Sequence, residues 1–179
     1  MLYVFLAEGF EEIETISTVD ILRRAGLETQ MVGVGATQVT GTHGITVTAD
    51  LIDASIDIKS AKGIVLPGGM PGTHNLEKSP AVQAAIDHCA AQGLLIAAIC
   101  AAPSILGHKG LLKGVPATAF GSYVNELNGA ITVNAPLARH KNFITARSAG
   151  FTMDFALSIV EYFKGPQVAM TLHKSLHGM

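Results

Sequence analysis

Tryptophan is absent from this 179-residue chain, cysteine occurs only twice, and charged residues make up only 15% of it. Two cysteines cannot form the disulfide framework of a small secreted domain, and neither belongs to the Cys-x-x-Cys pair typical of zinc sites. Disorder is excluded, because 49% of the residues are hydrophobic and can form a core. We therefore expect a globular protein with free thiols and no metal.

The chain also lacks basic clusters and long apolar segments. Its 12 basic and 14 acidic residues leave a net charge of -2, which argues against binding a nucleic-acid backbone. The least charged window, 89–107, is interrupted by Gly93 and Pro103, so no membrane span is expected. No basic residue precedes Arg23, so the signal-peptide pattern is missing. These absences predict a cytoplasmic protein with neither nucleic acid nor membrane as a partner.

Short apolar strands alternate with amphipathic helices along the whole chain. Buried strands are predicted at 2–6, 29–34, 63–66 and 94–99, and further strands at 117–120, 131–133 and 143–146. A hairpin is predicted at 39–48, and helices at 13–25, 80–92, 101–106, 153–163 and 167–176. This alternation predicts one α/β domain, residues 1–179, with a mostly parallel sheet and helices on both faces.

Three segments follow predicted strands directly, where open α/β sheets bind their ligands: 7–14, 67–74 and 100–103. Cys100 lies between the most apolar strand and a helix rich in small residues, which is the layout of a nucleophile elbow. The adjacent helix N-terminus is expected to lower the pKa of its thiol. Cys89 lies on the apolar face of a predicted helix and is expected to be structural.

The other two segments offer partners for Cys100. Gly68 and Gly69 let backbone N–H groups approach an oxyanion closely, although a bare turn explains them equally well. Most of the glutamates at 8–14 suit the first turn of a helix, where the macrodipole favours acids. Glu14 is one turn inside that helix and can point back toward the cysteine. A carboxyl buried there would have a raised pKa and could share a proton with the thiol.

Four segments match motifs of a known family: AEGFEEIET at 7–15, VDILRRAG at 19–26, VLPGG at 65–69 and AAICAAP at 97–103. In these motifs and in their order the chain resembles the ThiJ/PfpI family, within its Parkinson-disease protein branch. The resemblance covers nearly the whole chain. It implies a flavodoxin-like three-layer sandwich, a homodimer, and a reactive Cys100 held in an unfavourable backbone conformation.

The resemblance also assigns residues to the site. Glu14 matches the family carboxylic acid that hydrogen-bonds the cysteine sulfur, and Gly69 and Ala101 match the N–H donors of an oxyanion pocket, beside which Gly68 also lies. Arg147 matches a basic residue near that pocket, although Ser148-Ala149 stands where the family more often has Gly-Pro.

Three further pocket positions complete the set. His43 stands where many relatives carry an arginine that reaches toward the neighbouring subunit's cysteine. Phe120 stands where some relatives have a histidine and others a phenylalanine. His74 is close enough in sequence to the glycine loop to line the pocket.

The leading interpretation is a cofactor-independent enzyme that acts on a small aldehyde or a glycated substrate. Members of the family that this chain resembles are described as glyoxalases and deglycases. Peptidase activity is disfavoured, since Ala101 follows Cys100 where the protease-like branch has a histidine. One alternative is a redox sensor or stress-protective protein whose Cys100 is oxidised to a sulfinic acid. The other is a binding or chaperone module in which Cys100 has no chemical role.

Overall fold

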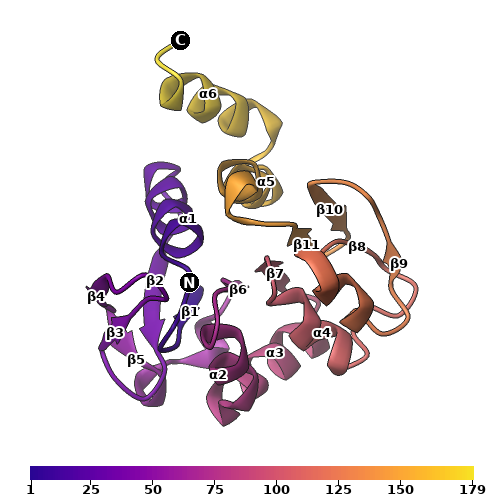
Figure 1. The fold of residues 1–179 in the computed structure, drawn as a ribbon. Coiled ribbons are helices and arrows are strands. Elements are labelled where there is room, and N and C mark those ends of the chain that lie inside the picture. Colours follow the sequence, from indigo (N-terminus) through magenta and orange to yellow (C-terminus); the bar gives the residue numbers. More distant parts are fainter.

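The computed structural model describes all residues, 1–179, and contains a central seven-stranded sheet, which Figure 1 shows with its surrounding helices. Its strands are β1 (Leu2–Leu6), β2 (Thr29–Gly33), β5 (Leu51–Ile52), β6 (Gly63–Leu66), β7 (Leu95–Ile99), β10 (Leu137–His140) and β11 (Phe143–Ala146). They lie in the order β10-β11-β7-β6-β1-β2-β5, and every neighbouring pair is parallel except β10 and β11. The mostly parallel sheet predicted from the sequence is confirmed.

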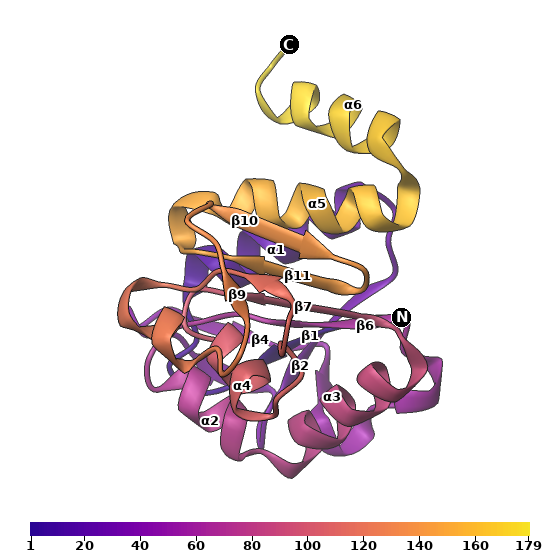
Figure 2. The same ribbon diagram turned by 90° about the vertical axis from the view of Figure 1, so that its right-hand side faces the viewer.

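Helices cover both faces of this sheet. The helices are α1 (Glu12–Arg24), α2 (Gly72–Lys78), α3 (Pro80–Gln92), α4 (Pro103–His108), α5 (Thr152–Lys164) and α6 (Pro166–Leu176). Helices α1 and α5 pack together on one face, and α2, α3 and α4 lie on the other (Figure 1). The last helix, α6, packs on α5 and extends away from the sheet (Figure 2). The molecule is therefore a flavodoxin-like three-layer sandwich, as expected.

Side chains along β1 point alternately into the two hydrophobic cores, one on each face of the sheet. Tyr3 and Phe5 belong to the core beneath α3, whereas Val4 and Leu6 belong to the core that α1 and α5 cover. Because both faces of the strand are buried, its residues read as one continuous apolar run. Full burial of such a side chain contributes about 1.5–3 kcal/mol relative to leaving it exposed. Both cores therefore stabilise the strand whose carboxyl end leads into the candidate site.

Several elements differ from the sequence predictions. The hairpin at 39–48 is confirmed as β3 (Gln38–Thr40) and β4 (Thr46–Thr48), which form a small antiparallel sheet. The strand predicted at 117–120 is only Pro116–Ala117 (β8), and it pairs with β9 (Ile131–Thr132) outside the central sheet. Helix α2 and the edge strands β5 and β10 were not predicted, because each is short or carries mixed polarity.

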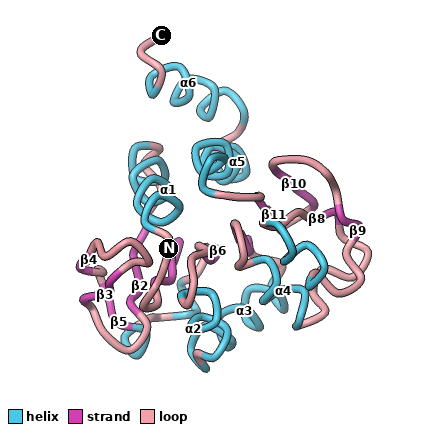
Figure 3. Tube along the Cα trace, viewed as in Figure 1, coloured by secondary structure: helices cyan, strands magenta, loops and turns pink.

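Helix limits agree with the sequence predictions to within one residue except for α4, which was predicted at 101–106 and lies at Pro103–His108. The Ser79 hydroxyl caps α3 by accepting the Val82 N–H, and Gly93 ends the helix with a left-handed φ of 64°. Four short 3-10 helices, at Asp53–Ser55, Ile58–Ser60, Gly121–Glu126 and Ala149–Phe151, lie between the longer elements (Figure 3). None of the helices combines the length and the apolar character needed to cross a bilayer.

Candidate functional site

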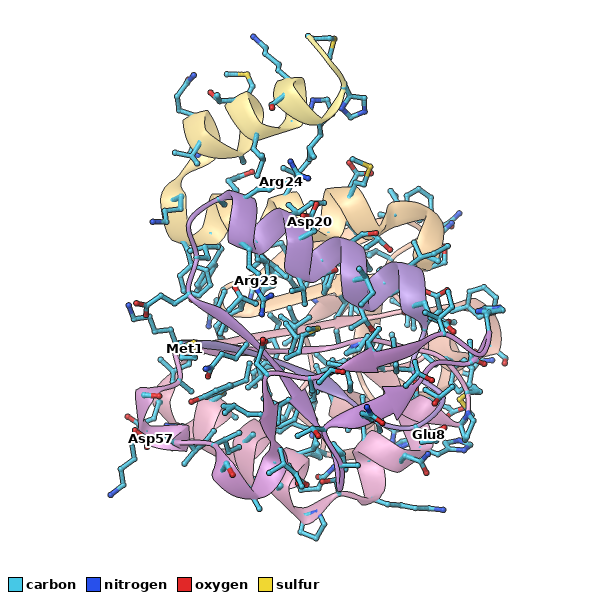
Figure 4. All side chains as sticks on the ribbon, turned by 90° about the vertical axis from the view of Figure 1, so that its left-hand side faces the viewer. Met1, Glu8, Asp20, Arg23, Arg24 and Asp57 are labelled. Atoms are coloured by element: carbon cyan, nitrogen blue, oxygen red, sulfur yellow. The ribbon has the colours of Figure 1, made fainter.

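The loops that follow β1 and β6 meet at the carboxyl edge of the sheet. Figure 4 shows Glu8, just beyond β1, at the opposite end of the molecule from Met1. The N–H of Glu11 donates to the Gly68 carbonyl at 3.0 Å, and the N–H of Gly72 donates to the Gly9 carbonyl at 3.1 Å. These bonds hold the acidic segment against the glycine loop, so two of the three predicted segments are in direct contact.

Cys100 directly follows β7 and has a left-handed backbone conformation with φ of 65°. A residue with a side chain pays about 1–3 kcal/mol for such a conformation, which the surrounding structure must enforce. Here the Cys100 N–H donates to the Ala146 carbonyl at 2.9 Å, and its carbonyl accepts the Phe120 N–H at 2.8 Å. Helix α4 begins shortly afterwards, at Pro103. This is the sharp strand-to-helix turn that the sequence predicts for a nucleophile elbow.

Backbone donors surround the sulfur. The N–H groups of Gly69 and Ala101 hydrogen-bond the Cys100 sulfur, and each lowers its pKa. Gly69 has φ of 91°, a conformation that glycine adopts without strain. At Gly68 a Cβ atom would lie 2.6 Å from the Cys100 Cβ and 2.8 Å from Oε2 of Glu14. The glycine pair therefore leaves space for the sulfur and supplies one donor to it.

Glu14 is the carboxyl beside this sulfur. The side chain of Glu11 accepts the Glu14 N–H at 2.7 Å and so caps α1, which places Glu14 in the first turn. Glu14 is only 1% exposed, and its Oε2 accepts the Gly68 N–H at 2.8 Å. Its Oε1 is buried without a hydrogen bond of ordinary geometry. Burial raises the pKa of Glu14 to about 7, although the bonds from Gly68 and Cys100 act to lower it.

The Cys100 thiol does not have the lowered pKa expected from the sequence. Burial raises the pKa of Cys100 to about 12, and the charge and hydrogen bonding of Glu14 add to the increase. The donors of Ala101 and Gly69 oppose it without reversing it. Two interacting groups of this kind titrate as a pair. Glu14 and Cys100 therefore form a thiol–carboxyl pair in which Glu14 is the group that titrates near neutral pH.

Arg147 lines a neighbouring cavity of about 430 Å³, and Phe120 lies in the chain between two of its lining residues, Ala119 and Gly121. Arg147 follows β11, and its Nη2 donates to Oδ1 of Asn134 at 2.8 Å. Phe120, which was expected to line the pocket, is not among the lining residues and is 50% exposed. Thr118, Thr132 and Asn134 also line this cavity. Sequence reasoning missed these three, because their positions carry no motif.

His43 and His74 are exposed and belong to different neighbourhoods. The Nδ1 of His43 lies 2.9 Å from Oε2 of Glu12, which joins the β3–β4 hairpin to α1. The hydrogen bond that the His43 ring donates to the Glu12 carboxylate raises the pKa of His43. Burial acts to raise the pKa of Glu12, but the side-chain and backbone bonds from His43 lower it overall. His74 lies on α2 and makes no side-chain hydrogen bond.

Glu11, Glu12 and His43 together offer three ligand atoms that all lie within 4.8 Å of one another. This is the only such grouping of potential metal ligands in the chain, and the sequence shows no spacing that predicts it. Its members already serve other bonds, since Glu11 caps α1 and Glu12 binds His43. The hydrogen bonds between His43 and Glu12 therefore account for the position of the hairpin beside α1 without a bound ion.

Comparison with known proteins shows relatives of the whole chain. The chain is 32% identical over 176 residues to protein dj-1beta of Drosophila melanogaster, covering 97% of this chain and 94% of the relative. It is 30% identical to glutathione-independent glyoxalase DJR-1.2 of Caenorhabditis elegans, covering 94% and 91%. It is also 30% identical to deglycase TK1284 of Thermococcus kodakarensis, covering 82% and 89%.

Structural similarity extends over the same length. The oxidized DJ-1 structure of Toxoplasma gondii matches with a TM-score of 0.94 and 30% identity, covering 98% of this chain and 96% of that one. The family model described as DJ-1/PfpI matches residues 1–162, which contain every residue of the candidate site. The motifs, the fold and these matches agree that this chain belongs to the DJ-1/PfpI family.

Proposed function

We propose that this protein is a cofactor-independent enzyme that acts on small reactive carbonyl compounds, with Cys100 as the nucleophile and Glu14 as the proton-transfer group. The observation that carries the proposal is the pairing of a strained strand-end cysteine with a buried carboxyl whose pKa is about 7. A general base is most effective when its pKa lies near the working pH. The relatives named a glyoxalase and a deglycase support the same class of substrate.

The first step joins the sulfur to the aldehyde carbon of a 2-oxoaldehyde. The Glu14 carboxylate accepts the thiol proton while the S–C bond forms and the C=O electron pair moves to oxygen. The N–H groups of Gly69 and Ala101, which already bond the sulfur, stand near the developing oxyanion and can stabilise it. Glu14 then returns its proton to this oxygen, which gives a hemithioacetal.

The remaining steps move a hydrogen between neighbouring carbons. Glu14 removes the proton from the former aldehyde carbon and, through an enediol, a proton is delivered to the adjacent carbon. The first carbon is thereby oxidised to a thioester and the second reduced to an alcohol, so no external oxidant is needed. Water hydrolyses the thioester and restores the thiol. Methylglyoxal and water would thus give lactate.

The test is turnover of methylglyoxal by the purified protein. We expect lactate to form with the wild type, and turnover to be lost in Cys100→Ser and Glu14→Ala. Cys89→Ser is the matched control, because Cys89 lies in α3 within the core and away from the strand ends. Turnover by the wild type that is no faster than by Cys100→Ser would overturn the proposal.

Redox sensing is the second candidate function. The Cys100 sulfur lies between two backbone N–H donors and the Glu14 carboxyl, and these groups could hydrogen-bond the oxygens of a sulfinate. Mild peroxide treatment followed by intact-mass measurement tests it. A gain of two oxygens that requires Cys100 supports sensing, whereas an unmodified Cys100 opposes it.

A homodimer completes the proposed functional unit. Ile13 and Ile16 are 57% and 39% exposed on α1, and Ile45 of the neighbouring hairpin is 57% exposed. The Ile45 N–H lies 3.4 Å from Oε1 of Glu12, so the hairpin residue stands beside the first turn of α1. A second copy of this chain would cover these side chains.

Light scattering tests this assembly. The measured mass should be twice the chain mass for the wild type and equal to one chain mass for Ile13→Asp. A monomeric wild type would contradict the assembly.

The free thiols also favour a reducing compartment, and we place the protein in the cytoplasm on that ground. Cell fractionation that recovers it outside the cytoplasm would contradict this placement.

A further inference from the structure

Arg147 is the only arginine of this chain that forms no ion pair. The other three are each paired with a carboxylate: Arg23 with Asp50, Arg24 with Asp20 and Arg139 with Glu161. Arg147 makes one side-chain hydrogen bond, to the amide oxygen of Asn134, which carries no charge to balance the guanidinium. A partly buried guanidinium without a carboxylate is suited to bind an anion from solution.

Strand register places this arginine beside the nucleophile. Ala146 of β11 pairs with Ile99 of β7, so Arg147 and Cys100 directly follow the paired ends of two neighbouring parallel strands. Neighbouring strands lie about 4.8 Å apart. The Cys100 N–H also donates to the Ala146 carbonyl at 2.9 Å, which keeps the two strand ends together.

The cavity of about 430 Å³ at Arg147 has the chemistry of an anion site. Its lining residues include Thr118, Thr132 and Asn134, and none of them carries a carboxylate. Ala119 and Gly121 also line it, and Phe120 between them donates its N–H to the Cys100 carbonyl. The chain segment that supplies Ala119 and Gly121 to the cavity is therefore hydrogen-bonded to the reactive residue through Phe120.

We propose that this cavity binds a carboxylate of the substrate, so that the preferred substrates are 2-oxoaldehydes that carry a carboxylate a few carbons from the aldehyde. The proposal rests on the carbonyl chemistry proposed above and names its substrate class. The cavity contains one guanidinium and no second cation. It therefore matches a singly charged carboxylate better than a doubly charged phosphate, and the planar fork of arginine suits the two carboxylate oxygens. The carboxylate itself takes no part in bond changes.

The direct test compares 4,5-dioxopentanoate with its methyl ester, which differ in one charge. We expect the wild type to have a higher kcat/KM for the carboxylate, which should give 2-hydroxyglutarate. In Arg147→Gln the ratio of the two kcat/KM values should fall about tenfold or more, the effect of losing one charged hydrogen bond, and Arg147→Lys should keep part of it. An unchanged ratio in Arg147→Gln, or a wild type that prefers the ester, overturns the proposal.

Arg24→Gln is the matched control for loss of one positive charge. Arg24 is in the last turn of α1, away from the sheet edge that Glu8 marks (Figure 4). The ratio of the two kcat/KM values should be the same in this variant as in the wild type. A fall in Arg24→Gln equal to that in Arg147→Gln would assign the effect to net charge and overturn a specific site.

A second measurement separates this proposal from the proposed function. Levulinate and methyl levulinate, which are ketones that cannot undergo the aldehyde reaction, can be tested for protection of Cys100 against iodoacetamide. Levulinate should protect at a concentration about tenfold lower than the ester, and Arg147→Gln should remove the difference. If levulinate protects Cys100 but no aldehyde is turned over, the proposed enzymatic function is rejected and the anion site is retained. If aldehydes are turned over but both compounds protect Cys100 equally, the anion site is rejected and the enzymatic function is retained.

Discussion

The Gly68 N–H donates to Oε2 of Glu14 at 2.8 Å and so fixes the carboxyl beside the sulfur of Cys100. The bond joins the glycine loop after β6 to the first turn of α1, two elements far apart in the sequence. A Cβ atom at position 68 would meet both the carboxyl oxygen and the cysteine. The pair of reactive groups therefore depends on a backbone position that has no side chain of its own.

Gly68→Ala tests this dependence. The added methyl group must displace either Cys100 or Glu14, so we expect a loss of stability of about 1–3 kcal/mol. We also expect carbonyl turnover to fall at least about tenfold, since small displacements of reacting groups are costly. Gly150→Ala is the control, because a Cβ there meets nothing within 4 Å. Thermal unfolding and the turnover assay check both effects, and equal behaviour of the two variants would contradict the argument.

Glu14→Gln should change the pH dependence of stability. The pKa of Glu14 is raised from 4.5 to about 7 in the folded protein, so the unfolded chain releases this proton at lower pH. Stability contributed by the protonated carboxyl is therefore complete below about pH 4.5 and is lost as the pH rises to about 7. At 1.36 kcal/mol per pKa unit the loss reaches about 3 kcal/mol.

Glutamine resembles the protonated carboxyl and does not titrate. The variant should match the wild type near about pH 4 and exceed its stability at about pH 8 by up to that amount. Denaturant unfolding at the two pH values measures the difference. A difference between the proteins that does not vary with pH would show that Glu14 is ionised in both states.

The pH dependence of turnover should report the same carboxyl. Since Glu14 acts as a base, kcat/KM for methylglyoxal should rise as the pH passes through about 7, the pKa of this group. In Glu14→Gln we expect a loss of about 100-fold or more and no inflection at that pH. A wild-type profile without an inflection between about pH 5.5 and 8.5 would exclude Glu14 as the base.

Replacement by serine should have opposite effects on stability and turnover at the two cysteines. Cys89 is fully buried in the apolar core under α3, where burial raises its pKa to about 11. Cys89→Ser places a hydroxyl in that core and should cost about 1–3 kcal/mol of stability while leaving the site intact. Cys100→Ser should instead abolish turnover with little change in the unfolding temperature. If the protein's biological function were unchanged in Cys100→Ser or Cys100→Ala, that result would support a binding or chaperone role in which Cys100 has no chemical part.

Much of the fold could be predicted from local patterns. The strands β1, β6 and β7 are buried on both faces, so their sequences are continuous apolar runs. Helix α3 carries an N-cap serine and a terminal glycine, and its limits were predicted correctly. Helix α2 and strands β5 and β10 were missed, because a short mostly polar helix and an edge strand carry no such signal.

The sequence by itself determined the α/β alternation, the strand-end position of Cys100 and the place of Glu14 one turn inside its helix. Only the tertiary structure decided how these groups titrate, because desolvation depends on every neighbour that excludes water and not on adjacent residues. Burial in the tertiary structure raises the pKa of the Cys100 thiol, whereas the helix terminus alone was expected to lower that pKa. The tertiary structure also placed Arg147 at a cavity without a carboxylate, since strand register, a long-range property, brings β11 beside β7.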